Sequence, residues 1–200
     1  MSLNPLSDPT LAYYDAHAEE FVQRTLGVDM SPLYARFLPF IPPGGHILDA
    51  GCGSGRDSRV FLDRGFRVTA FDGSAALAKM ARETTKVQVS HRTFAEIDWQ
   101  EEFDGVWACA SLLHLAAPQL ADAVCRLVDA LKVGGTLYAS FKKGTGAGFR
   151  EGRFFADHDS KTLAQLIMSM ERLKALDIWE SEDQRRQEIV WVNGLCTRTM

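Results

Sequence analysis

The stretch from Asp49 to Gly55 constrains the fold of this 200-residue chain more than any other feature. It follows the apolar pair Ile47 and Leu48, holds three glycines at alternate positions, and leads into a helical pattern that starts at Arg56. Glycine permits a tight turn and leaves space for a ligand because it has no Cβ. In parallel α/β sheets, ligands bind beyond the carboxyl ends of the strands. The turn therefore predicts a parallel sheet with a ligand site at its edge.

Apolar runs and amphipathic patterns alternate along the chain, and this alternation predicts the fold class. We expect strands at 46–49, 67–71, 87–90, 103–108, 136–141, 173–179 and 189–197. We expect helices at 10–26 (capped by Asp8 or Thr10), 32–40, 56–64, 74–82, 118–131 and 160–170, and a glycine-rich loop at 144–152. Alternating strands and helices imply a doubly wound α/β sheet with helices on both faces. The last two strands have only a short polar link, so we expect them to be antiparallel.

Length and composition fit one domain. A chain of 200 residues that is 46% hydrophobic can bury a sizeable core without disulfides or metals. We expect a single domain over residues 1–200, made of an N-terminal helical segment at 1–43 and an α/β core at 44–200.

Charge, cysteine usage and hydropathy exclude several classes of protein. The formal net charge is −4, whereas a duplex DNA binder usually presents a basic face, so no DNA partner is expected. The four cysteines form no CxxC pair and no His, Asp and Glu cluster has ligand spacing, so no metal is expected. No run approaches the roughly 18 apolar residues of a membrane span, and the first nine residues have no apolar core of a signal peptide. We therefore expect a cytoplasmic protein with no membrane partner.

Two acids at neighbouring strand ends indicate which ligand the turn binds. A dinucleotide site has the spacing GxGxxG, whereas this turn has GxGxG preceded by Asp49. An acid at this strand end suits a ligand with an ammonium and a sulfonium group better than a pyrophosphate. Asp72 ends the next expected strand, where an acid accepts hydrogen bonds from ribose hydroxyls. Both features favour S-adenosylmethionine, and a plain helix cap is the alternative for Asp72.

Four stretches resemble motifs of the class I S-adenosylmethionine-dependent methyltransferases. Residues 47–55 (ILDAGCGSG) resemble the first motif of the family, and Asp72 lies where the family keeps its ribose-binding acid. Residues 103–106 (FDGV) resemble the fourth-strand motif, and residues 131–137 (LKVGGTL) resemble the entry to the fifth strand, with Val in place of Pro. The stretch 51–58 is similar to the tellurite-resistance-type (TehB-like) branch.

The resemblance implies a Rossmann-like seven-stranded sheet of order 3-2-1-4-5-7-6, with strand 7 antiparallel and N-terminal helices acting as a lid. The cofactor would contact the turn, the end of the second strand and the loop after the third. Many relatives have an acid near position 94 that meets the adenine amine, whereas here Phe94 stands there and Glu96 follows. Backbone groups of Phe94 and Ala95 are therefore the expected adenine contacts. The implied cofactor-binding residues are Asp49, Ala50, Gly51, Cys52, Gly53, Ser54, Gly55, Asp72, Gly73, Ser74, Phe94 and Ala95.

Two side chains are candidates for catalysis, His114 and Tyr14. His114 follows the fourth expected strand and could act as a base or bind the acceptor, or it could be a structural histidine. Tyr13 and Tyr14 lie on the first expected helix, and one ring, with Tyr14 favoured, could cover the sulfonium through a cation–π contact. Core packing is the alternative for both tyrosines. Because the sulfonium is already activated, the reaction needs little beyond alignment and exclusion of water.

Basic residues gather around the expected loop after the fifth strand. Lys142, Lys143, Arg150 and Arg153 together with Glu151 give a local charge of about +3. An anionic substrate and a solvated loop are the two interpretations. On the last expected strand, Trp191 is assigned to packing and Asn193 receives no role.

These features predict an S-adenosylmethionine-dependent methyltransferase that acts on a small-molecule or metalloid acceptor. An RNA or protein methyltransferase is a second hypothesis. The acidic balance disfavours RNA, while the basic residues around the loop leave it open. A protein that holds the cofactor without using it is a third hypothesis, and a nicotinamide oxidoreductase is a fourth.

Overall fold

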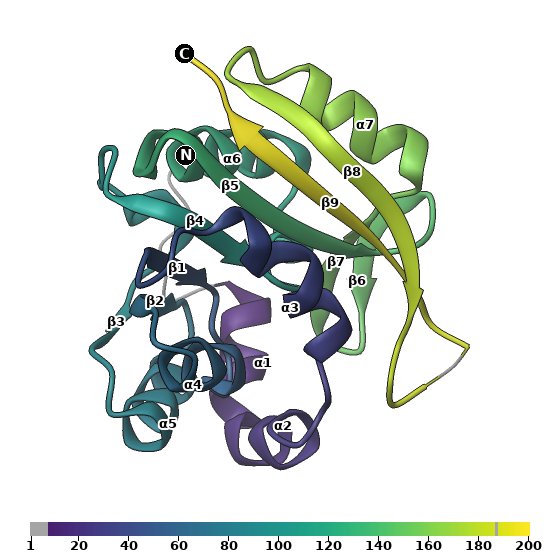
Figure 1. The fold of residues 1–200 in the computed structure, drawn as a ribbon. Helices are drawn as coiled ribbons and strands as arrows, with labels where there is room; N and C mark the ends of the chain where they lie inside the picture. Colours follow the sequence, from purple (N-terminus) through teal and green to yellow (C-terminus); the bar gives the residue numbers. More distant parts are fainter. Residues whose placement is uncertain (1–7, 187) are drawn as a thin grey trace.

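The computed structural model describes residues 8–186 and 188–200, so the first seven residues of the expected N-terminal segment lie outside the described part (Figure 1). Its main sheet has seven strands in the order β3-β2-β1-β4-β5-β9-β8. The strands are β1 (His46–Ala50), β2 (Arg67–Asp72), β3 (Val89–His91), β4 (Phe103–Ala108), β5 (Leu131–Lys142), β8 (Leu173–Glu182) and β9 (Val190–Arg198). Strands β1 to β5 pair in parallel, and β9 is antiparallel to both neighbours. The predicted fold class and strand order are confirmed.

Helices cover both faces of the sheet (Figure 1). They are α1 (Pro9–Ala16), α2 (Ala18–Thr25), α3 (Ser31–Phe37), α4 (Arg56–Asp63), α5 (Ala75–Thr85), α6 (Ala117–Ala130) and α7 (Ser160–Met168), with 3-10 turns η2 (Leu38–Phe40), η3 (Phe94–Glu96) and η4 (Leu112–His114). One face packs against α6 and α7, whose buried residues include Leu127 and Ile167. The other face packs against α3 and α4 through Phe37 and Phe61, which contact the strand residue Trp107.

The first expected helix is two helices, so the prediction of one helix to Leu26 is wrong. Asp8 caps α1 as expected, because its side chain accepts a hydrogen bond from Thr10 N at 2.8 Å. The break lies at His17, whose φ of −119° is not helical. The His17 ring nitrogen Nδ1 is 2.8 Å from Tyr13 O, so side chain and backbone compete for the same carbonyl.

The prediction of a loop at 144–152 is also wrong, because most of these residues belong to a β-hairpin. Strands β6 (Gly146–Arg150) and β7 (Arg153–Asp157) pair antiparallel and form a separate two-stranded sheet. Glu151 and Gly152 make the two-residue turn, with φ of 49° and 78°. Positive φ at both turn positions matches the right-handed twist of a hairpin. Of the four basic residues, Arg150 and Arg153 occupy strand positions of the hairpin, whereas Lys142 ends β5 and Lys143 follows it.

Within the described residues, no helix combines the length and apolar character needed to cross a membrane.

Candidate active site

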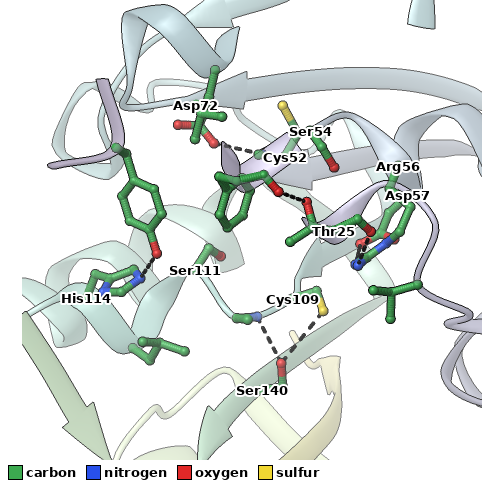
Figure 2. A pocket seen from close by; sticks show the side chains of 18 of the residues that line it. Thr25, Cys52, Ser54, Arg56, Asp57, Asp72, Cys109, Ser111, His114 and Ser140 are labelled. Carbon is green, nitrogen blue, oxygen red and sulfur yellow. Dashed lines mark hydrogen bonds and ion pairs between the residues drawn. The ribbon is translucent and has the colours of Figure 1, made fainter. Parts of the chain in front are cut away.

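A cavity of about 750 Å³ lies beyond the carboxyl ends of β1, β2, β4 and β5. Helices α1 and α2, the hairpin β6–β7 and the connection between β8 and β9 also contribute residues to its wall. In the view of Figure 2, Asp72 and His114 lie on one side of the pocket and Arg56 and Asp57 on the other. The volume falls within the range of small-molecule sites, roughly 300–1,000 Å³.

The glycine turn after β1 brings bare backbone to the cavity wall. Gly51 and Gly53 have φ of 77° and 54°, a region that L side chains rarely adopt. A Cβ on Gly51 would stand 2.5 Å from the Cβ of Ser111, and one on Gly53 would stand 3.0 Å from the ring of Phe21. Side chains at either position would therefore clash with the neighbouring wall, so the turn forms a cradle that only glycine permits.

Asp72 lies across from this cradle, at the end of β2. Its carboxylate accepts a hydrogen bond from Gly53 N at 2.8 Å and another from Ser74 N at 2.8 Å, one at each oxygen. Burial raises its pKa, although these two hydrogen bonds act in the opposite direction. Each carboxylate oxygen has a further lone pair, so Asp72 can still accept hydrogen bonds from ligand hydroxyls.

Asp49 lies behind the turn. It is buried and accepts a 2.6 Å hydrogen bond from the Ser58 hydroxyl, which fixes α4 against β1. Burial, together with the nearby Asp57 carboxylate, raises the pKa of Asp49 to about 8. Its expected contact with the cofactor stays a prediction, because its carboxylate is not part of the cavity wall.

The expected cofactor-binding residues fall into two groups, those in the cavity wall and those outside it. Those in the cavity wall are Gly51, Cys52, Gly53, Ser54, Asp72, Gly73 and Phe94. Those outside the wall are Asp49, Ala50, Gly55, Ser74 and Ala95. Ser74 has a structural partner instead, because its hydroxyl donates to Asp15 at 2.6 Å.

The expected adenine end of the cavity contains Phe94, in η3. Its ring meets Phe71 edge to face at 5.3 Å. The Glu96 carboxylate already has partners within the protein, because it accepts hydrogen bonds from the backbone and the hydroxyl of Thr93, each at 2.8 Å. Phe94 therefore offers the cavity an apolar ring at this end.

Tyr14 and His114 both belong to the cavity wall, and Figure 2 labels His114. The His114 Nδ1 atom is 2.7 Å from Phe154 O, and a carbonyl only accepts, so Nδ1 carries the proton. The bare Nε2 then accepts the hydrogen bond from the Tyr14 hydroxyl at 2.9 Å. Burial, aided by Arg153, lowers the pKa of His114 to about 4, and burial raises that of Tyr14. Both side chains are therefore neutral near pH 7.

A buried charged cluster was missed from the sequence. Arg56 and Asp57, at the start of α4, form an ion pair of 2.6 Å. Asp57 also accepts hydrogen bonds from the Tyr34 hydroxyl and, at 2.8 Å, from Trp107 Nε1. Burial alone would raise the pKa of Asp57, but Arg56 and these donors outweigh it, so its pKa is lowered. In the sequence, the only indication of this cluster is that Arg56 and Asp57 stand next to each other after the glycines.

Strand β9 supplies a polar wall that the sequence did not reveal. Asn193 is buried, accepts from the Tyr138 hydroxyl at 2.7 Å and donates to Ser181 Oγ at 3.0 Å. Trp191 donates from its indole nitrogen to Asp183 at 3.0 Å. These contacts depend on the register of β9 against β5 and β8, which no local pattern gives.

Comparison with known proteins identifies a domain. Residues 47–135 match the family model described as a methyltransferase domain. A ubiquinone biosynthesis O-methyltransferase from Xanthomonas campestris pv. campestris is 36% identical over 114 residues, which are 54% of this chain and 47% of that protein. The chain thus spans about half the length of the curated relatives it matches.

Solved structures share the fold. The chain matches the 1,6-didemethyltoxoflavin-N1-methyltransferase of Burkholderia thailandensis, with S-adenosylhomocysteine bound, at a TM-score of 0.76 and 22% identity, over 100% of this chain and 94% of that one. It also matches a TehB-like S-adenosylmethionine-dependent methyltransferase from Corynebacterium glutamicum at a TM-score of 0.71 and 22% identity, over 92% and 99%.

The domain match and the relatives agree with the predicted methyltransferase class, and the solved structures share its fold. These matches do not distinguish the TehB-like branch within the class I methyltransferases.

Proposed function

We propose that this chain, which contains a methyltransferase domain over residues 47–135, transfers a methyl group from S-adenosylmethionine to a small-molecule acceptor. One observation carries the proposal. A single cavity joins the glycine cradle and Asp72 to the pair of Tyr14 and His114. Its volume of about 750 Å³ suits the cofactor together with a small acceptor.

The residues of the cradle fit the cofactor. Bare backbone at Gly51 and Gly53 lets a ligand approach the turn, and the buried carboxylate of Asp72 is suited to the ribose hydroxyls. Phe94 offers its ring and its backbone groups to the adenine, whereas Ala95, the other expected contact, lies outside the cavity wall. Asp49 acts from behind the turn, where it holds the start of α4 through Ser58. When bound, the cofactor supplies an activated methyl group.

Tyr14 and His114 are the proposed catalytic residues. His114 is held by Phe154 O in the tautomer that leaves Nε2 as an acceptor. An acceptor hydroxyl that replaces Tyr14 at Nε2 would be oriented by the same lone pair and would lose its proton to it during transfer. The low pKa of His114, about 4, makes it a weak base, so orientation is its main contribution.

We assign residues 1–43 to a lid and residues 44–200 to the core of one domain. Helix α1 carries Tyr14 to the cavity and is tied to the hairpin, because Thr10 Oγ accepts a hydrogen bond from Phe154 N at 3.0 Å. Helix α2 adds Phe21 to the wall. Both helices therefore help to exclude water from the site.

The test is release of S-adenosylhomocysteine on incubation with a panel of acceptors. The relatives direct the panel to phenols and carboxylates, and the TehB-like structure adds tellurite as a metalloid oxyanion. RNA and a protein extract are included in the panel as macromolecular acceptors. Turnover with a small acceptor supports the proposal. Turnover with a macromolecule alone, or binding of the cofactor with no turnover throughout, contradicts it.

A further inference from the structure

Three cations converge on one buried phenyl ring beside the proposed catalytic pair. The Lys142 ammonium lies 4.2 Å from the ring centre of Phe155. The guanidinium carbons of Arg150 and Arg153 lie 4.6 and 5.2 Å from the same centre. Each contact gains cation–π attraction, but three like charges this close also repel one another. The cluster is therefore stabilised by any negative charge nearby.

Two carboxylates neutralise two of the three cations. Arg150 makes a bidentate pair with Asp157 at 2.7 and 2.6 Å. Arg153 binds Glu151 at 3.0 Å through one terminal nitrogen only. In the chain described by the structure, Arg153 Nε is buried without a hydrogen-bond partner. Its donors are therefore only partly used.

Lys142 is the remaining cation. Its ammonium makes no ion pair or hydrogen bond with the residues at 8–186 and 188–200, whereas the adjacent Lys143 pairs with Glu180 at 2.8 Å. Half-burial and the two arginines, which outweigh Asp157 and Glu151, lower the pKa of Lys142. Three positive and two negative charges leave an excess of one.

The excess charge faces the cavity. Lys142, Arg153 and Phe155 all belong to its wall, as does His114, whose ring lies 4.9 Å from that of Phe155. Asp8, another acid in this part of the wall, offsets part of this charge, but its carboxylate caps α1 and makes no ion pair with Lys142 or Arg153 among the described residues. The unpaired donors thus lie where an acceptor molecule would meet His114.

We propose that the acceptor molecule carries a monoanionic group of the carboxylate class, which Lys142 and Arg153 bind beside His114. This inference rests on the proposed function and names its substrate class. A carboxylate supplies the partner that the Lys142 ammonium lacks among the described residues, and two cationic donors match its two oxygens with charge-assisted hydrogen bonds. The group anchors the acceptor and leaves its nucleophile directed at the site.

The test is calorimetric titration of the protein saturated with S-adenosylhomocysteine, using benzoate and its neutral analogue benzamide as probes. We expect benzoate to bind at least about 10-fold more tightly, a difference of ~1.4 kcal/mol. The preference should fall to about 2-fold or less in Lys142→Met. It should persist in Lys142→Arg, which keeps the charge, and in Lys143→Met, the matched control outside the cavity wall.

Binding of S-adenosylhomocysteine is measured first in every variant, which separates the two proposals. Absent binding of this nucleoside contradicts the proposed function. Three outcomes with normal nucleoside binding overturn the anionic-acceptor inference alone. They are equal affinities for the two probes, no binding of either probe, and a benzoate preference that survives Lys142→Met. Melting temperatures show whether both variants fold, and Lys142→Gln, which also removes the charge, takes the place of Lys142→Met if that variant does not fold.

Discussion

The Tyr14 hydroxyl lies 2.9 Å from His114 Nε2, which joins helix α1 to the turn after β4 across 100 positions of sequence. The hydrogen bond occupies the one lone pair through which His114 could contact an acceptor. The position of α1 is therefore coupled to the access of an acceptor to His114.

Removal of the Tyr14 hydroxyl tests this coupling. In Tyr14→Phe, an acceptor no longer has to displace the Tyr14 hydroxyl from His114 Nε2, and we expect its KM to fall by about 3-fold or more. Affinity for S-adenosylhomocysteine should change little. Steady-state kinetics with the best acceptor of the panel give the measurement. Tyr13→Phe is the control, since the Tyr13 ring stacks on His17 at 4.2 Å; equal KM values in the two variants would refute this competition.

Burial of His114 makes stability depend on pH. Its pKa is about 4 in the folded state and near 6.5 when unfolded, so the unfolded chain binds more protons between these values. The free energy of unfolding should therefore be lost as the pH falls from about 6.5 to about 4, by about 1–3 kcal/mol for this group. Urea unfolding across that window checks it. In His114→Gln the fall should be smaller by this amount; identical slopes for both proteins would disprove the shift.

A side chain at Gly53 should prevent cofactor binding. The alanine Cβ would strain a backbone at φ 54° and stand 3.0 Å from Phe21. We expect Gly53→Ala to weaken S-adenosylhomocysteine at least about 10-fold, a loss of ~1.4 kcal/mol, and Gly53→Val to abolish its binding. Gly27→Ala, where a Cβ meets nothing within 4 Å, is the matched control. Normal affinity in Gly53→Val would show that the ligand avoids the turn.

Loss of Asp57 should destabilise the protein strongly. Asp57→Ala leaves the Arg56 guanidinium, whose side chain is only 16% exposed, without its carboxylate partner, and breaking a buried pair costs about 3–5 kcal/mol. Asp63→Ala on the same helix breaks an exposed pair with Arg59 and should cost less than about 1 kcal/mol. Urea unfolding of both variants gives the comparison. A small loss in Asp57→Ala would mean that water replaces the carboxylate.

The sheet and the cofactor cradle could be predicted because their signals are local. The glycine turn and Asp72 belong to one strand–helix–strand unit, so spacing alone places them at adjacent strand ends. The hairpin was missed because Gly146 and Gly148 hide the alternation of a strand. Its turn residues, Glu151 and Gly152, were the signal that could have revealed it.

The acceptor side could not be predicted because it is built by long-range contacts. Asn193 faces Ser140 only through the antiparallel register of β9 on β5. Trp191 was assigned to packing, yet it lies in the cavity wall and donates to Asp183. The sequence named Tyr14 and His114 separately, and their hydrogen bond depends on how α1 lies over the sheet.

Calorimetric titration with S-adenosylhomocysteine tests the central claim, the binding of the cofactor's adenosyl nucleoside between the glycine cradle and Asp72. The account predicts binding to the wild-type protein and a loss of about 1–3 kcal/mol in Asp72→Ala, with Asp98→Ala, an exposed acid paired with Arg92, unchanged. NADH should not bind. No heat from the nucleoside, or equal affinity in Asp72→Ala and wild type, would contradict the claim.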